Sequence, residues 1–246
     1  MANQAQREKN ELIRDRVVMP LLETAETAYI TGSGDAFGSP HFRGILKKLC
    51  EPRYTVEIIL GTNGQLITPR LWQEFEPLHA RFRDITISID GATPETFERL
   101  RRGSSWEKLQ VTMGILSTAR RLGRIRRLKV NMVVQQTNFL EMRPLLALCR
   151  AWAVDAVLFY RLRQWGNILP NHYLASDIAN PLHPRHPELL RELARPDFDD
   201  AMIERYDMFE LIARAQSARQ ARPANASGTA VLAAEAAEAA LALVGT

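Results

Sequence analysis

The chain has 246 residues, of which 46% are hydrophobic and 24% are charged, and its formal net charge at pH 7 is +4. These values are typical of a soluble globular chain with a sizeable core, and the mild charge gives little reason to expect a nucleic-acid partner. No apolar run is long enough to cross a membrane and no signal peptide is recognisable, so we expect a cytoplasmic protein without membrane partners.

One pattern recurs five times along the chain: an apolar strand, a polar strand end and then a helix. A helix predicted over residues 4–25 precedes the first unit. The predicted strands occupy residues 28–30, 54–60, 85–89, 129–134 and 156–159. This alternation predicts an α/β fold of parallel strands with the helices outside, either a partial (β/α) barrel or an open doubly wound sheet. Because parallel strands end at one edge, we expect a shared polar site there.

The third unit, residues 85–94, is the most regular of the five. Isoleucines alternate with polar residues along its strand, which predicts one buried face and one polar face. A Ser or Thr followed by Pro begins its helix and two others, at residues 39–40, 68–69 and 93–94. Ser88 and Asp90 therefore stand at the C-terminal end of a strand, where parallel α/β folds bind ligands.

The regular pattern ends near residue 166, and the composition changes again near residue 221. Short helices are predicted over residues 187–194 and 199–216. We divide the chain into a core, an irregular and partly helical extension, and an alanine-rich tail of low complexity: residues 1–166, 167–220 and 221–246.

Several other candidate sites have simpler explanations. Residues 32–38 contain glycines between a strand and a helix, but their spacing departs from the dinucleotide-binding fingerprint. His183 and His186 are too few for a zinc site. Cys50 and Cys149 fall in predicted helices far apart in the sequence, which favours reduced core thiols. The sequence therefore predicts no metal site.

Taken together, the five units resemble the core of a radical S-adenosylmethionine (radical SAM) enzyme, of the kind followed by a SPASM-type auxiliary-cluster domain. The resemblance covers about residues 11–187. Residues 32–35 resemble the Gly-Gly-Glu-type motif that holds the methionyl amino group, and residues 62–64 resemble the Thr-Asn-Gly that closes the next strand. Residues 87–92 resemble the strand that contacts the ribose, and Arg102 resembles the arginine that binds the methionyl carboxylate.

The remaining two strands also have counterparts, residues 133–139 and residues 157–160, the latter resembling the strand whose backbone flanks adenine. The resemblance implies that the cofactor is S-adenosylmethionine, bound by Ser33, Gly34, Asp35, Asn63, Ser88, Asp90 and Arg102. It places on the substrate side Gln135, Asn138, Tyr160 and Arg163.

One part of the family pattern is missing. The Cys-x3-Cys-x2-Cys motif after the family's first strand binds three irons of a [4Fe–4S] cluster, whose ligands are thiolates. This sequence contains only two cysteines and no such triad. The five strands therefore correspond to the second through sixth of a six-strand partial barrel, without the first strand and the cluster loop. We expect the chain not to bind the cluster, and the sheet edge left exposed to be able to pair with another chain.

Three functions remain open. The family activity is reductive cleavage of S-adenosylmethionine to a 5′-deoxyadenosyl radical that modifies a peptide or small-molecule substrate, in which case this chain is a truncated or degenerate member. The alternative is a non-catalytic module that binds S-adenosylmethionine or another nucleoside. An unrelated α/β enzyme with its site at the same strand ends is the third, although no nucleophile arrangement supports it.

Overall fold

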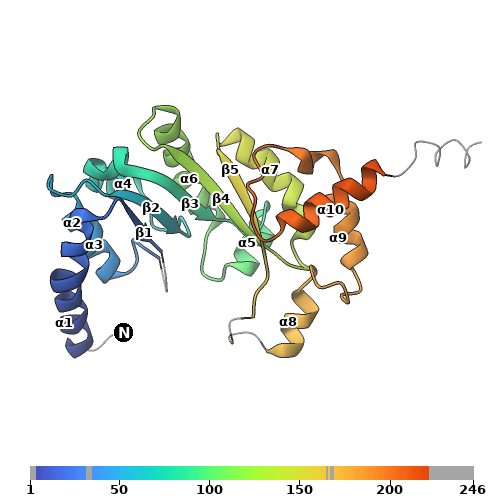
Figure 1. The fold of residues 1–246 in the computed structure, drawn as a ribbon, viewed down its shortest axis with the longest axis horizontal. Helices are drawn as coiled ribbons and strands as arrows, with labels where there is room; N and C mark the ends of the chain where they lie inside the picture. Colours follow the sequence, from blue (N-terminus) through green and yellow to red (C-terminus); the bar gives the residue numbers. More distant parts are fainter. Residues whose placement is uncertain (1–3, 32–34, 165, 167–168, 222–246) are drawn as a thin grey trace, which may run out of the picture.

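The computed structural model describes residues 4–31, 35–164, 166 and 169–221. Its centre is a single five-stranded sheet in which every pairing is parallel and the strand order follows the chain. The strands are β1 Thr27–Ile30, β2 Glu57–Thr62, β3 Phe82–Ser88, β4 Arg127–Val134 and β5 Ala156–Arg161. With helices around this sheet, the molecule has the predicted α/β fold of a partial barrel (Figure 1).

Alternating side chains give the sheet two different faces. In β3 the outward-facing Ile85 and Ile87 are fully buried, while Thr86 between them and Ser88 after them are only half-buried. In β4 the side chain of Asn131, which is opposite Ser88 in the register, shares the half-buried face. Since successive strand residues point to opposite faces, the helices cover the apolar face and the inner face stays polar.

Three helices of the core begin at their predicted starts, at residues 40, 69 and 94. Thr68 and Thr93 cap their helices by accepting the backbone N–H groups of Leu71 and Thr96. The side chain of Ser39 makes no such bond, so the helix after it starts without the predicted cap. The core helices are α1 Gln4–Ile13, a π-turn Arg14–Val18, α2 Met19–Thr24, α3 Pro40–Leu49, α4 Pro69–Glu74, α5 Pro94–Leu100, α6 Trp106–Arg121 and α7 Met142–Ala151. Short 3-10 helices cover Glu76–Arg81, Phe139–Glu141 and Pro196–Asp199.

The C-terminal extension packs onto the β5 side of the sheet (Figure 1). It contains α8 Pro170–Ser176, α9 His186–Leu193 and α10 Phe209–Gln220. The buried apolar residues of α9 and α10 join the same core as the barrel. Beside β5, the Val157 N–H donates to the Met202 carbonyl (2.8 Å) and the Glu204 N–H donates to the Val157 carbonyl (3.0 Å). This short parallel bridge occupies the β5 edge at Val157, whereas β1 has only β2 as a partner among the described residues.

None of the helices in the described ranges combines the length and the apolar character needed to span a bilayer.

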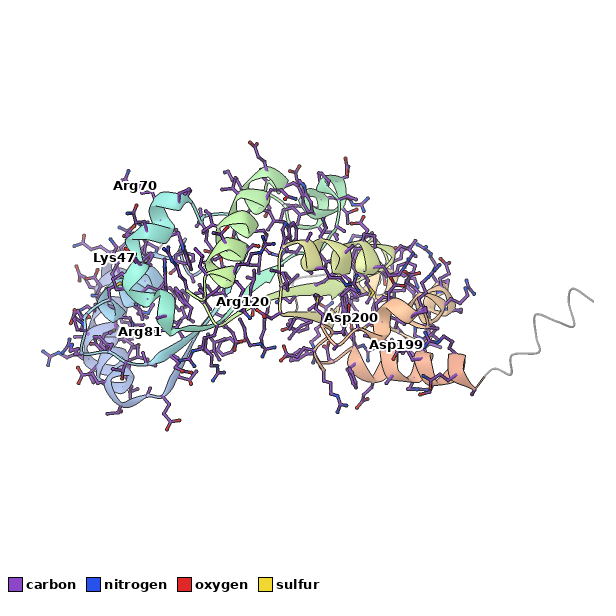
Figure 2. All side chains as sticks on the ribbon, turned by 90° about the horizontal axis from the view of Figure 1, so that it is seen from above. Lys47, Arg70, Arg81, Arg120, Asp199 and Asp200 are labelled. Atoms are coloured by element: carbon purple, nitrogen blue, oxygen red, sulfur yellow. The ribbon has the colours of Figure 1, made fainter. Side chains whose placement is uncertain are left out.

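A bidentate ion pair ties α6 to the loop before β5. Arg120, labelled in Figure 2, donates from Nε and Nη2 to the two carboxylate oxygens of Asp155, both at 2.7 Å. The same carboxylate accepts the Leu128 N–H at the start of β4 (2.8 Å). Burial alone would raise the pKa of Asp155, but these hydrogen bonds outweigh it and hold the pKa below its ordinary value.

Replacing Asp155 with asparagine should reduce the free energy of unfolding by about 1–2 kcal/mol at neutral pH, the scale of hydrogen bonds to a half-exposed charged group. Because the folded-state pKa is lowered, the carboxylate's contribution is complete above the unfolded-state pKa of about 3.9 and disappears as the pH falls through the folded-state value. Urea denaturation at a series of pH values measures this, with the exposed Glu11→Gln as control. A deficit that stays constant through acid pH would contradict the assignment.

Candidate functional site

A polar cavity of about 410 Å³ lies at the C-terminal end of the sheet, on its inner face. All five strands or the loops after them contribute to it, so the sheet curls around this space. Its lining residues are Tyr29, Thr31, Asp35, Gly61, Thr62, Asn63, Thr86, Ser88, Arg101, Asn131 and Tyr160. We call it the strand-end cavity. It has the size and the few convergent polar groups of a small-molecule site.

Asp35 fastens the loop after β1 to the end of β2. Its Oδ2 accepts the Asn63 N–H (2.9 Å) and the Thr62 hydroxyl, and its Oδ1 accepts the Phe37 N–H (2.9 Å). A carboxylate can accept about four hydrogen bonds, so these three donors from the described residues leave room for one more. Because Asp35 lines the cavity, that remaining position is available to a cationic ligand group.

The turn after β2 is held in place by a hydrogen bond within the turn and by another from α6. The Asn63 Oδ1 accepts the Gln65 N–H (2.9 Å), and Gly64 has a φ of 72°, which a residue with a side chain rarely adopts. The buried Thr112 hydroxyl of α6 donates to the Gly64 carbonyl (2.5 Å). These bonds fix the backbone of Asn63 while its side chain faces the cavity.

The loop after β3 is built around Asp90, which is 8% exposed. Its Oδ1 accepts the Val133 N–H of β4 (2.8 Å), and its Oδ2 lies 3.0 Å from the Nε of Arg101. Asp90 itself does not line the cavity; the guanidinium paired with it does. Arg102 is exposed and lies outside the lining, so the arginine that reaches the strand-end cavity is its neighbour Arg101.

Glu141, the residue directly before α7, fixes the same loop. Its carboxylate accepts the backbone N–H groups of Ala92 (2.6 Å) and Thr93 (3.2 Å) and the hydroxyl of Thr96. A Cβ added to Gly91 would stand 2.7 Å from the Phe97 nitrogen, so the close approach of this loop to α5 requires glycine.

The inner face supplies neutral hydrogen-bonding groups. Thr86 and Ser88 of β3 and Asn131 of β4 line the cavity beside Tyr160 of β5. Burial and the neighbouring ring of Tyr206, whose centroid is 4.4 Å away, raise the pKa of Tyr160 to about 12. Tyr160 is therefore a neutral phenol at physiological pH.

The other residues assigned to the substrate side lie outside the strand-end cavity. Asn138 is 1% exposed, and its amide donates to the carbonyls of Asp90 and Val133, both at 2.9 Å. Its Oδ1 accepts the Gln135 N–H (2.8 Å), so both ends of the side-chain amide are hydrogen-bonded to backbone groups. Arg163 pairs with Asp207 instead, at 3.0 Å.

The predicted residues are thus brought together only in part. Those that line the cavity are Asp35, Asn63, Ser88 and Tyr160, and those that do not are Asp90, Arg102, Gln135, Asn138 and Arg163. Ser33 and Gly34 lie outside the described residues. The polar alternation of β4, which repeats that of β3, is the sequence signal that identifies Asn131 as a further lining residue.

The described residues contain no cluster of three or more His, Cys, Asp or Glu side chains that could hold a metal ion. His183 and His186 bond instead to the carbonyls of Ala175 (3.1 Å) and Ile178 (2.9 Å). Burial raises the pKa of the Cys149 thiol to about 12, which keeps it protonated inside α7.

No family model and no curated protein matches the sequence. Among solved structures, the chain is similar to SuiB from Streptococcus suis, with 13% identity over 74% of this chain and 40% of that one and a TM-score of 0.47. For the radical S-adenosylmethionine methyltransferase TsrM from Kitasatospora setae, the identity is 14% over 63% of this chain and 29% of that one, with a TM-score of 0.41.

For anSMEcpe, solved with bound AdoMet and a peptide called Kp18Cys, the identity is 13% over 76% of this chain and 51% of that one, with a TM-score of 0.47. The chain therefore spans about half the length of these structures or less. At these identities and TM-scores the likeness assigns neither a family nor an activity.

Replacing Asn138 with alanine should reduce the free energy of unfolding by about 2–4 kcal/mol, because two buried carbonyls and one N–H lose their partner. Replacing the neighbouring Gln135, whose side chain has no such role, should change it by no more than about 0.5 kcal/mol. Urea denaturation of both variants measures the difference. Equal stability of the two variants would show that the Asn138 network does not support the loop.

Proposed function

We propose that this chain is a radical SAM-type module whose strand-end cavity binds S-adenosylmethionine but which does not itself supply the iron–sulfur cluster. The observation that carries the proposal is the joint presence of Asp35, Ser88 and Arg101 around one cavity at the ends of parallel strands. A truncated or degenerate family member and a non-catalytic binding module would both bind S-adenosylmethionine, so the proposal is compatible with either of these two hypotheses.

The chemistry of the lining suits the cofactor. S-adenosylmethionine carries an ammonium group, a carboxylate, ribose hydroxyls and an adenine ring. Asp35 retains one acceptor position for the ammonium group, and the Arg101 guanidinium can donate to the carboxylate. Ser88 and Asn131, facing each other across β3 and β4, offer a hydroxyl and an amide for the ribose. In this arrangement Arg101 takes the role that the sequence resemblance gives to Arg102.

A [4Fe–4S] cluster does not fit the residues of this chain. It requires several thiolates close together, whereas Cys149 is buried in α7 and Cys50 ends α3. Burial raises the pKa of both thiols, which disfavours the thiolate form. We therefore assign no radical step to these residues. The peptide or small-molecule substrate that the family resemblance implies would be modified only in an assembly that also provides a cluster.

Isothermal titration calorimetry of the full chain should detect submillimolar binding of S-adenosylmethionine. Ser88→Leu, which fills the cavity, should weaken it at least about tenfold, equivalent to about 1.4 kcal/mol. The same change at the exposed Ser217 of α10 is the matched control and should leave the affinity unchanged. Wild-type binding that survives Ser88→Leu would place the ligand elsewhere and contradict the proposal.

Titration with adenosine distinguishes a module that recognises S-adenosylmethionine from one that binds nucleosides in general. Asp35 and Arg101 recognise the methionyl part in our proposal, so adenosine should bind at least about tenfold more weakly than S-adenosylmethionine. Equal affinities would instead favour a general nucleoside module and contradict the assigned roles of these two side chains.

Anaerobic reconstitution with iron and sulfide should leave the chain without a stoichiometric [4Fe–4S] cluster, because no thiolate set is present to bind it. Iron and sulfide analysis with an absorption spectrum provides the measurement. A stoichiometric cluster on the wild-type chain that persists after gel filtration would contradict this expectation.

A further inference from the structure

A second and larger cavity, of about 700 Å³, lies between α9, α10 and the end of β5. The two helices pack against each other beside β5 (Figure 1). Arg161 from β5, Arg191 from α9 and Arg214 from α10 all line this space, which we call the arginine cavity. Three separate elements thus bring a guanidinium to one cavity.

These three arginines differ from most others around them. Within the described ranges, Arg161, Arg191 and Arg214 make no ion pair, whereas Arg219 in the same lining pairs with Asp199 at 2.7 Å. Of the two carboxylates in the lining, Asp207 is already paired with Arg163. The other carboxylate, Glu210, is the single counter-charge in the described lining to the guanidinium groups of these three arginines, so the cavity keeps an excess of positive charge.

The rest of the lining is largely apolar. Small side chains at the contact between the two helices leave the space open, and the apolar lining residues are Ala179, Pro181, Leu190, Ala194, Leu211, Ala215 and Ala218. Burying such a surface against an apolar ligand is favourable, at about 25 cal/mol per Å². A ligand that matches both parts of the lining must combine an anionic group with an apolar body.

We propose that the arginine cavity binds an amphipathic organic carboxylate, a molecule with one carboxylate and an aliphatic body. The fork of a guanidinium matches a carboxylate in two parallel hydrogen bonds. Inorganic phosphate would leave the alanine and leucine surface in water. No Phe, Tyr or Trp occurs in the described lining, and its one imidazole, that of His186, is buried and bonded to the Ile178 carbonyl, so a nucleotide base would find no exposed aromatic side chain to stack on. The volume is that of a small-molecule site.

This site is separate from the strand-end cavity. Tyr160 and Arg161 are consecutive in β5, and consecutive strand residues point to opposite faces. Accordingly, Tyr160 lines the strand-end cavity and Arg161 lines the arginine cavity. The inference therefore does not depend on the proposed binding of S-adenosylmethionine, and neither result decides the other.

Dodecanoate is the probe, titrated into the full chain in a calorimeter at submillimolar concentration. We expect saturable 1:1 binding that weakens as salt is added, because the arginines are exposed. The double variant Arg191→Gln/Arg214→Gln should weaken binding at least about tenfold. Ala218→Phe, which fills the cavity at an exposed position, should weaken it by a similar factor.

The matched control is Arg70→Gln on α4, which removes another exposed arginine without an ion pair in the described chain and is labelled at the far side of the molecule in Figure 2. It should leave the dodecanoate affinity unchanged. Circular dichroism of each variant confirms the fold.

Four results would overturn the proposal: no saturable dodecanoate binding, an equal loss with Arg70→Gln, equal affinity for dodecanol, or equal displacement by inorganic phosphate. Tighter binding of an acidic peptide than of dodecanoate would also overturn it, since the occupant would then be a protein segment.

Discussion

The structure depends on the strict alternation of apolar and polar side chains in its two central strands. The isoleucines of β3 and four alternate residues of β4, Leu128, Val130, Met132 and Val134, are fully buried beneath the helices, and this burial fixes the register of both strands. A shift by one residue would turn these side chains to the inner face and bury Ser88 and Asn131 under the helices instead. The polar lining of the strand-end cavity is therefore a consequence of how the opposite face packs.

Carboxylates and amides then shape the loops that leave the strands. Asp35, Asp90 and Glu141 accept backbone N–H groups from loops or strands distant in the sequence, and Asn138 satisfies the backbone around Asp90. Such buried bonds are costly to leave unpaired, which gives the loops one conformation. Asp35 and Asp90, the two carboxylates predicted to bind the cofactor, therefore accept most of their hydrogen bonds from the protein itself. Arg101 is held in position by its ion pair with Asp90.

Periodicity in the sequence was sufficient to predict five parallel strands, the caps at Thr68 and Thr93 and the location of the cavity. The predicted second strand began at Tyr54, but the side chain of Arg81 takes the Tyr54 carbonyl, and β2 begins later, at Glu57. Helix α8 falls in the part of the extension for which no helix was predicted, because no residue of it is buried and its apolar pattern is weak.

The choice between Arg101 and Arg102 lay beyond sequence reasoning. Both follow the end of α5 at Leu100, and the pairing of Arg101 with Asp90 forms between residues eleven apart in the sequence, which a local pattern does not encode. Sequence reasoning could not separate the predicted residues that line the strand-end cavity from those that do not for the same reason. Hydrogen-bond partners far apart in the sequence decide which polar side chains remain free to face the cavity.

The bridge between residues 202–204 and β5 gives the sheet two unlike edges. Within the described chain, β1 pairs only with β2, whereas the outer edge of β5 is bridged at Val157. Two copies that met through β1 would be related by a twofold axis, and their strands would pair antiparallel across it. Each copy would then present to the outside the β5 edge, where the bridge at Val157 stands in the way of a further strand, so strand pairing would favour two chains over a fibre.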